Sequence, residues 1–375
     1  AGLQAGTSYN YRLAAVRSAG TSGYSTVATA TTEEEAVITD VDVTANITTD
    51  TRWTADKTYH LKGFIKVANG ATLTIDAGTR IEGDYETLGA SLFVLRGALI
   101  LVGNGIINRS GTVIVEGTNT DDNVNPAVPY SGGNNNADNS GSLKYVRVEY
   151  AGYAPAQDAE LNSFTFAAVG SGTTLEYLQA HNGLDDAFEF FGGAVSGKYL
   201  VSYETGDDHY DMSEGYVGRL QYLIAYQSKQ LDPRPNAGGV ASDPQGIEND
   251  GCGSNAGGGC DNGYNSTPFT VPVVANFTLV GSAAGLVGSS GGYGMVLRRG
   301  TGGHYVNGII AHWPTGAIGY RDAQSKERET AGLLTLQGLY AAETATLFQN
   351  GQQTYAGPAP SSTPRPPRQP RCSAR

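Results

Sequence analysis

The feature that most constrains the fold is one short strand pattern that recurs at a nearly fixed interval. The segments Glu176–Gln179, Lys198–Val201 and Gln221–Ile224 each place a tyrosine directly before a leucine, and they begin 22 and 23 residues apart. Lys144–Arg147 carries the same pattern with a valine in place of the leucine. A recurring unit of this length is one coil of a parallel β-helix, in which each strand lies above its counterpart at about 4.8 Å.

Stacking of the coils turns repeated residues into ladders along the solenoid. Successive side chains of a strand point to opposite faces, so one ladder faces the core and its neighbour faces outward. We expect the core ladder to be leucine and the outer, flanking ladder to be tyrosine, that is Leu178, Leu200 and Leu223 against Tyr177, Tyr199 and Tyr222. The general rule for crossovers between parallel strands predicts a right-handed, single-stranded solenoid.

Composition supports an all-β chain and limits its partners. With 52 glycines and only two methionines among 375 residues, the chain favours short strands and tight turns over helices. The net charge of −12 excludes binding to nucleic acid or to an anionic membrane surface, since both require a basic face. No run of 18 apolar residues is present, so we expect no membrane-spanning segment. The acidic balance fits cations or neutral glycans.

Residues 1–32 show a different pattern, two alternating strands around a glycine-containing turn. They resemble the last two strands of a fibronectin type III domain, with Leu3, Tyr9, Ala15–Val16 and Ser18–Gly20 at the matching positions. The resemblance implies a partial β-sandwich, and two strands cannot bury a face alone. We therefore expect residues 1–32 to contact a neighbouring subunit, which predicts a homo-oligomer or filament.

The remaining boundaries follow from composition. A charged linker is expected at 33–44, the β-helix at 45–350, and a disordered proline- and arginine-rich tail at 351–375. Within the β-helix, glycine- and asparagine-rich stretches predict surface loops at 117–140 and 232–268.

Two of the three cysteines, Cys252 and Cys260, lie in one glycine-rich segment. We predict a disulfide between them, which fits an oxidising compartment. A zinc site is the competing interpretation, but it requires two further cysteine or histidine ligands, and none lies between residues 246 and 268.

The most informative chemical feature is an acidic pattern that repeats in register with the strands. Residues 184–190 read LDDAFEF and residues 206–212 read GDDHYDM, so three carboxylates recur 22 residues later: Asp185, Asp186 and Glu189, then Asp207, Asp208 and Asp211. Like charges about 5 Å apart repel by about 3 kcal/mol at an effective dielectric of 20. A bound cation removes that repulsion, and clustered carboxylates suit Ca²⁺. Glu214, Glu248 and Asp250 are candidates to complete the shell.

Two alternatives stay open for these acids. They are also typical turn residues, which accept backbone N–H groups while their charges stay in water. They also match an acidic cleft that binds or cleaves a glycan, although a lyase would need a nearby basic residue, and Lys198 and Arg219 stand in no recognisable motif. His181 and His209 lie beside the acids, where a histidine could be a metal ligand or proton carrier, but at the corner of a coil we expect exposed, satisfied residues. The tyrosines are expected to form packed ladders rather than sugar-stacking platforms.

The segments TLTIDAGTRI, GSLKYVRVEYAG, LDDAFEFFGG and HYVNGIIAHWP resemble a largely uncharacterised family of exported bacterial surface proteins and lipoproteins. The resemblance covers about residues 45–345 and implies a parallel β-helix and a secreted or outer-surface location. Together these observations predict a non-enzymatic structural or adhesive protein stabilised by Ca²⁺. The alternative is a carbohydrate-active enzyme, a polysaccharide lyase or hydrolase, or a glycan-binding module that uses the acidic face.

Overall fold

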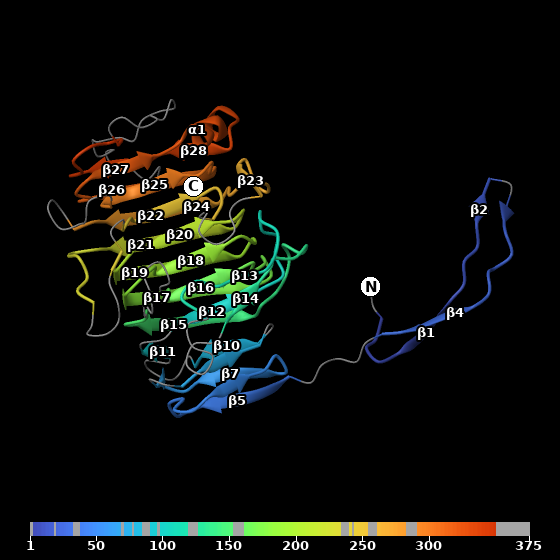
Figure 1. Ribbon diagram of the computed structural model, residues 1–375. Helices are drawn as coiled ribbons and strands as arrows, with labels where there is room; N and C mark the ends of the chain where they lie inside the picture. Colours follow the sequence, from blue (N-terminus) through green and yellow to red (C-terminus); the bar gives the residue numbers. More distant parts are fainter. Residues whose placement is uncertain are drawn as a thin grey trace, which may run out of the picture.

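The computed structural model describes residues 3–18, 20–32, 38–68, 71–76, 79–84, 91–95, 98–118, 127–152, 161–233, 240–241, 244–253, 261–282 and 291–349. The chain winds into coils that stack along one axis, and the strands of successive coils form two long parallel sheets (Figure 1). The predicted all-β parallel β-helix is therefore confirmed. No helix among the described residues is long and apolar enough to cross a membrane.

The first sheet contains the longer strands. Its order is β5, β7, β10, β15, β17, β19, β21, β24, β26 and β28, with β8 and β11 joined beside β15, and β29 beside β26. The bounds are β5 Thr39–Val43, β7 Lys57–Leu61, β8 Phe64–Val67, β10 Arg80–Gly83, β11 Ser91–Leu95, β15 Ser142–Glu149, β17 Thr174–Gly183, β19 Ser196–Thr205, β21 Arg219–Tyr226, β24 Val273–Val280, β26 Gly303–Ala311, β28 Leu334–Gln337 and β29 Tyr340–Ala342. Strand β5 starts the solenoid at Thr39, inside the stretch expected to be linker.

The strand order of the second sheet is β12, β16, β18, β20, β22, β25 and β27. Its bounds are β12 Leu99–Val102, β16 Phe164–Ala167, β18 Phe188–Phe191, β20 Tyr210–Ser213, β22 Ile247–Asp250, β25 Tyr293–Arg298 and β27 Gly316–Tyr320. A small parallel pair, β6 Thr51–Trp53 and β9 Leu73–Ile75, belongs to the first coils. Each coil from β15 onward thus supplies one strand to each sheet.

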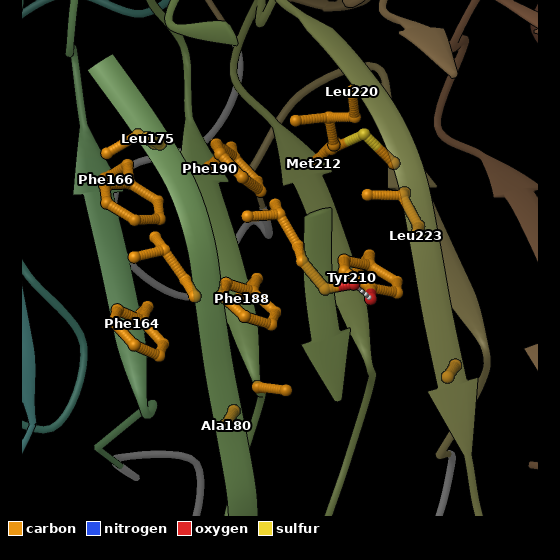
Figure 2. Packing of buried hydrophobic residues seen from close by; sticks show 14 of the residues in the cluster. Phe164, Phe166, Leu175, Ala180, Phe188, Phe190, Tyr210, Met212, Leu220 and Leu223 are labelled. Carbon is orange, nitrogen blue, oxygen red and sulfur yellow. Dashed lines mark hydrogen bonds between the residues drawn. The ribbon is translucent and has the colours of Figure 1, made fainter. Parts of the chain in front are cut away.

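The core lies between the sheets and consists of aromatic and aliphatic ladders (Figure 2). On the second sheet Phe164, Phe188 and Tyr210 stack with ring centroids 4.9 and 5.4 Å apart. On the first sheet the predicted leucine ladder is buried, with Leu178, Leu200 and Leu223 exposing at most 1% of their surface. The register pairs these leucines directly, as the 22-residue repeat predicts.

The tyrosine ladder occupies the outside, and its backbone is unusual. Tyr145, Tyr177, Tyr199 and Tyr222 all have φ between 57° and 61°, in the left-handed region. Their rings stack at 4.6 to 5.0 Å with interplanar angles of 4° to 10°. Asn276 and Asn307 continue the same column with φ of 56°. The column therefore marks a corner at which each long strand of the first sheet bends.

Residues 3–32 form a narrow antiparallel ribbon that lies apart from the solenoid in Figure 1. Strand β1 Ser8–Tyr11 pairs with β4 Ala28–Thr31, and β2 Val16–Arg17 pairs with β3 Gly20–Thr21. Leu13 and Val16 expose 78% and 81% of their surface. The segment thus contains four short strands where two were predicted, and its similarity to fibronectin type III remains a resemblance.

Two loop predictions were wrong, and one helix was not predicted. Residues 247–250, expected in a surface loop, form the fully buried strand β22. In the other expected loop, β14 Pro129–Tyr130 pairs with β13 Val113–Ile114, and Tyr130 packs into a small cluster over the outer face of the second sheet. An unexpected helix, α1 Ala323–Thr330, begins where the Asp322 carboxylate accepts the Ser325 N–H at 2.7 Å. The expected tail, 351–375, lies outside the described residues.

Candidate metal centre

The second sheet carries a row of carboxylates on its outer face. In β18 and β20, inward aromatic and methionine side chains flank Glu189 and Asp211, so these acids point away from the core. The register pairs Glu189 with Asp211 and Asp211 with Glu248. The 22-residue spacing therefore predicted the first pair correctly, and β22 adds a third member.

A second row lies in the turns that precede these strands, and it ties each coil to the next. Asn162 Oδ1 accepts the Asp186 N–H at 3.1 Å, and Asp186 Oδ1 accepts the Asp208 N–H at 2.8 Å. Asp208 Oδ1 accepts the Gln245 N–H in the same way. The turn interpretation is thus correct for one oxygen of each aspartate, but the carboxylates are buried and not solvated.

The carboxylates of the two rows lie close to each other. Three groups have ligand atoms within 4.8 Å of each other: Asp185, Asp186 and Asp207; Asp186, Glu189 and Asp211; and Asp208, Asp211 and Glu248. Asp186 exposes 5% of its surface, Glu189 3% and Glu248 4%. Seven acids of the sequence prediction therefore form one continuous cluster, five of them buried and two partly buried, called here the carboxylate cluster, which could hold a metal ion.

Electrostatics in the carboxylate cluster disfavour the charged forms. Burial raises the pKa of Asp186 well above its usual value, and the charges of Asp185 and Asp208 raise it further. Burial likewise raises the pKa of Glu189, together with the charge of Glu116. The pKa values of Asp211 and Glu248 are also raised, first by burial and then by Asp250. Burial and mutual repulsion therefore favour protonation of these acids or binding of a cation.

Two buried oxygens point to a cation rather than to internal hydrogen bonding. Asp211 Oδ1 and Glu248 Oε1 have no hydrogen-bond partner, although each is shielded from solvent. A buried polar atom without a partner is unfavourable by about 1–3 kcal/mol. Both residues belong to the same group of converging ligands, so a cation there would satisfy both oxygens.

Asp250 and Glu214 do not belong to the converging groups, and each forms an ion pair with arginine instead. Asp250 pairs with Arg298 at 2.7 Å and with Arg299. Arg298 also pairs with the second oxygen of Glu248. Burial lowers the pKa of Arg298, but the charges of Asp250 and Glu248 outweigh this and raise it overall. Arg298 thus stays protonated.

Glu214 forms a separate buried site at the other end of β20. Arg109 Nη1 lies 2.7 Å from Glu214 Oε1, with side-chain exposures of 7% and 1%. The Tyr130 hydroxyl donates to Glu214 Oε2 at 2.9 Å. These contacts neutralise Glu214 within the protein and attach the segment around β13 and β14 to the solenoid.

The prediction that both histidines near the acids are exposed was wrong, since His209 exposes 1% of its surface and His181 is only partly exposed. His209 is buried, and its Nδ1 lies 2.6 Å from Ser202 Oγ. Burial lowers the pKa of His209 to about 3, so the ring is neutral. His181 stacks on Tyr203 at 5.1 Å in an outer ladder. Neither belongs to the three converging groups.

Sequence reasoning missed several residues of this region. The Asn162 amide donates to Glu189 while its oxygen holds the Asp186 backbone, so it orients two acids at once. Its position one coil before Asp186 was the available signal. Arg298 lies 48 residues beyond Asp250, and only the coil register reveals their proximity. Cys252 is disulfide-bonded. Its predicted partner, Cys260, lies outside the described residues, so the pairing remains a prediction.

Comparison with known families agrees with this architecture. The model of the pectate-lyase-like beta helix domain matches residues 45–103 and 95–358. The chain belongs to the pectate-lyase-like β-helix family. No curated protein and no solved structure matches the chain. Membership in the pectate-lyase-like β-helix family therefore establishes the fold, while the chemistry must be argued from this chain's own residues.

Proposed function

We propose that this β-helix is a non-enzymatic structural scaffold of a secreted or cell-surface bacterial protein, and that Ca²⁺ bound in the carboxylate cluster rigidifies it. The observation that carries the proposal is the convergence of the buried Asp186 and Glu189 with the partly buried Asp211. Their mutual repulsion opposes the stacking of adjacent coils. A divalent cation turns that repulsion into an attraction between coils.

The donor set favours Ca²⁺ over other common ions. Each of the three converging groups consists of carboxylates alone, without histidine or cysteine, and a hard cation prefers oxygen ligands. Ca²⁺ accepts six to eight oxygens in flexible geometry, whereas Mg²⁺ requires a near-ideal octahedron. A row of acids spread over several turns suits the more tolerant ion.

Burial favours a structural role over a catalytic one. A catalytic carboxylate must reach its substrate, whereas Asp186, Glu189 and Glu248 expose at most 5% of their surface. The nearest cation to these acids is Arg298. Burial lowers the pKa of Arg298, but its carboxylate partners raise it by more, so the side chain stays protonated and cannot act as a general base. Lys198 and Arg219 lie on the first sheet.

The test is thermal unfolding of the full chain after chelation. Ca²⁺ at about one hundred times its dissociation constant would stabilise the folded state by about 2.7 kcal/mol. We expect EDTA to lower the melting temperature by several degrees and added Ca²⁺, but not Mg²⁺ at equal concentration, to restore it. Identical melting curves with EDTA and with Ca²⁺ would contradict the proposal.

A second candidate function, glycan binding or cleavage, rests on a specific observation. Asp207 and Asp211 are only partly buried, and Asp207 also lines a small pocket with His209, Lys229 and Trp313. Incubation with polyuronides and neutral glycans in Ca²⁺ tests this alternative through the release of new chain ends. Product formation that disappears in Asp207→Asn would replace the scaffold role with an enzymatic one.

The proposed location and a contact of the N-terminal ribbon with a partner have separate support. The disulfide at Cys252 fits an oxidising, extracellular environment. The exposed apolar residues of the N-terminal ribbon, among them Leu13, Val16 and Tyr24, agree with packing against a further chain or domain. An adhesive or filament-forming role follows from a rigid solenoid that displays such surfaces.

A further inference from the structure

The outer face of the first sheet carries two uncharged columns across four strands. In one column Val201, Ile224, Thr278 and Ile309 are successive register partners on neighbouring strands. In the other column Tyr203, Tyr226, Val280 and Ala311 are. These eight residues of β19, β21, β24 and β26 are called here the apolar outer face. The inward neighbours already fill the core, since Leu200, Leu223 and Leu279 are buried. Core packing therefore does not explain the apolar character of the outward positions.

The same two columns become polar toward the N-terminal coils. On β15 they hold Arg147 and Glu149, which pair with each other. On β17 they hold Gln179 and His181. That composition is typical of a face in water, so the fold does not require apolar residues at these positions. The change at β19 thus delimits a patch of the kind that marks an interaction site.

A sugar ring is a poor occupant for this surface. Tyr203 and Tyr226 stack at 5.4 Å and 16°, and Tyr199 and Tyr222, on the adjoining corner, stack at 5.0 Å and 5°. Tyr199 stacks between Tyr177 and Tyr222, and Tyr203 stacks between His181 and Tyr226, so both faces of these two rings are covered. Stacking of a pyranose needs an open ring face. The apolar outer face therefore favours contact with another protein surface.

The exposed area approaches what a weak dimer needs. Six side chains of this face and its corner expose between 38% and 49% of their surface: Tyr199, Tyr203, Tyr222, Ile224, Tyr226 and Ile309. If a large side chain presents about 150–250 Å², these six offer roughly 380–630 Å² per copy. The half-buried residues between them add to this, against about 800 Å² per partner in a standard interface.

We propose that the apolar outer face is a self-association surface, on which a second copy of this chain packs sheet against sheet about a two-fold axis. Stacked sheets pack about 10 Å apart with interdigitating side chains, which the isoleucine and tyrosine columns can supply. This inference goes beyond the proposed scaffold role. It is independent of Ca²⁺ and places the contact on a surface other than the N-terminal ribbon.

Sedimentation velocity of the full chain, from sub-micromolar to high micromolar concentration, tests the proposal. We expect a monomer–dimer equilibrium with a dissociation constant in the micromolar range. Ile224→Glu and Ile309→Glu should each weaken the dimer about tenfold or more, because a charge would be buried against an apolar partner. The matched controls Val16→Glu, on the ribbon, and Ile114→Glu, on β13, should dimerise like the parent protein.

Hydrogen exchange of the unmodified chain gives a second measurement. Dilution should increase exchange at 201–203 and 224–226 and leave the buried β18 unchanged. A monomer at every concentration would overturn the proposal, as would a dimer that persists in Ile224→Glu and Ile309→Glu. Loss of the dimer in Val16→Glu alone would assign self-association to the ribbon instead. None of these outcomes affects the Ca²⁺ test.

Discussion

Replacement of Asp186 by asparagine should change stability in opposite directions with and without Ca²⁺. Asp186 belongs to two of the three converging groups, and its Oδ1 accepts the Asp208 N–H. Asparagine keeps that acceptor, as Asn162 does one coil earlier. The substitution thus removes the charge and one potential ligand without breaking the hydrogen-bonded row.

The magnitude follows from the charges around Asp186. Burial and the charges of Asp185, Asp208 and Asp207 raise its pKa. A single like-charge pair about 5 Å apart contributes about 3 kcal/mol of repulsion at an effective dielectric of 20. Without metal at pH 8, Asp186→Asn should therefore stabilise the fold by about 2–3 kcal/mol. In saturating Ca²⁺ the variant should be the less stable protein, because it has lost a charged ligand.

The pH dependence has a definite sign. A carboxyl whose pKa is raised in the folded state binds more protons there than in the unfolded state, so stability without metal falls as pH rises above the unfolded value of about 3.9. The advantage of Asp186→Asn should accordingly shrink as the pH is lowered toward that value. Calcium should flatten the pH dependence of the parent protein by holding the carboxylates ionised.

Urea unfolding at several pH values, with EDTA or with Ca²⁺, measures these differences. Asp42→Asn serves as the charge-matched control, since Asp42 is 61% exposed and should change stability little under either condition. Asp186→Ala should be less stable than Asp186→Asn in both conditions, because it also removes the acceptor. A destabilising effect of Asp186→Asn in EDTA at pH 8 would contradict this prediction, because it would mean that other groups of the protein already compensate the negative charge of Asp186.

Three further outcomes are expected. Arg109→Ala should destabilise the protein by about 3–5 kcal/mol equally with and without Ca²⁺, because it leaves Glu214 buried without its ion-pair partner; urea unfolding under both conditions checks this. Glu248→Gln should weaken Ca²⁺ affinity measured by calorimetry while leaving the calcium-free melting temperature unchanged or higher. Gly281→Ala should cost about 1–3 kcal/mol, because its Cβ would lie 2.7 Å from Trp313 Cδ2 and 2.8 Å from the His312 carbonyl oxygen; the tryptophan fluorescence should shift with the melting curve.

The coil repeat could be predicted because equivalent residues recur at a short, nearly constant spacing in the sequence. Leu178, Leu200 and Leu223 recur at the length of one coil, so periodicity alone assigned them to the core. The same spacing placed Glu189 beside Asp211. Later coils are interrupted by insertions of unequal length. Spacing therefore could not recognise β22 as a strand or bring Arg298 to Asp250.

The left-handed tyrosine corner could not be predicted from residue preferences. A bulky residue avoids positive φ, and glycine or asparagine is the usual choice there. Asn276 and Asn307 follow that preference, whereas Tyr177 and Tyr199 do not. Ring stacking at 4.6 Å and the buried leucine that follows each of these tyrosines hold them in place. Tertiary packing thus overrides the local preference.

The carboxylate cluster was predicted in part for a similar reason. The acids themselves repeat visibly, but Asn162 breaks the acidic pattern although it occupies the same row. Glu214 matched the expected shell in sequence, and a contact across 105 residues with Arg109 removes it from the site. Such long-range pairing depends on how the segment before β15 folds over the second sheet.

The central claim, that the carboxylate cluster binds a structural Ca²⁺, is tested most directly by crystallography of the calcium-loaded protein at a wavelength where calcium scatters anomalously. We expect an anomalous peak bounded by oxygens of Asp186, Glu189 and Asp211 at about 2.3–2.6 Å. Ordered water alone at that position, with the same carboxylates protonated, would contradict it.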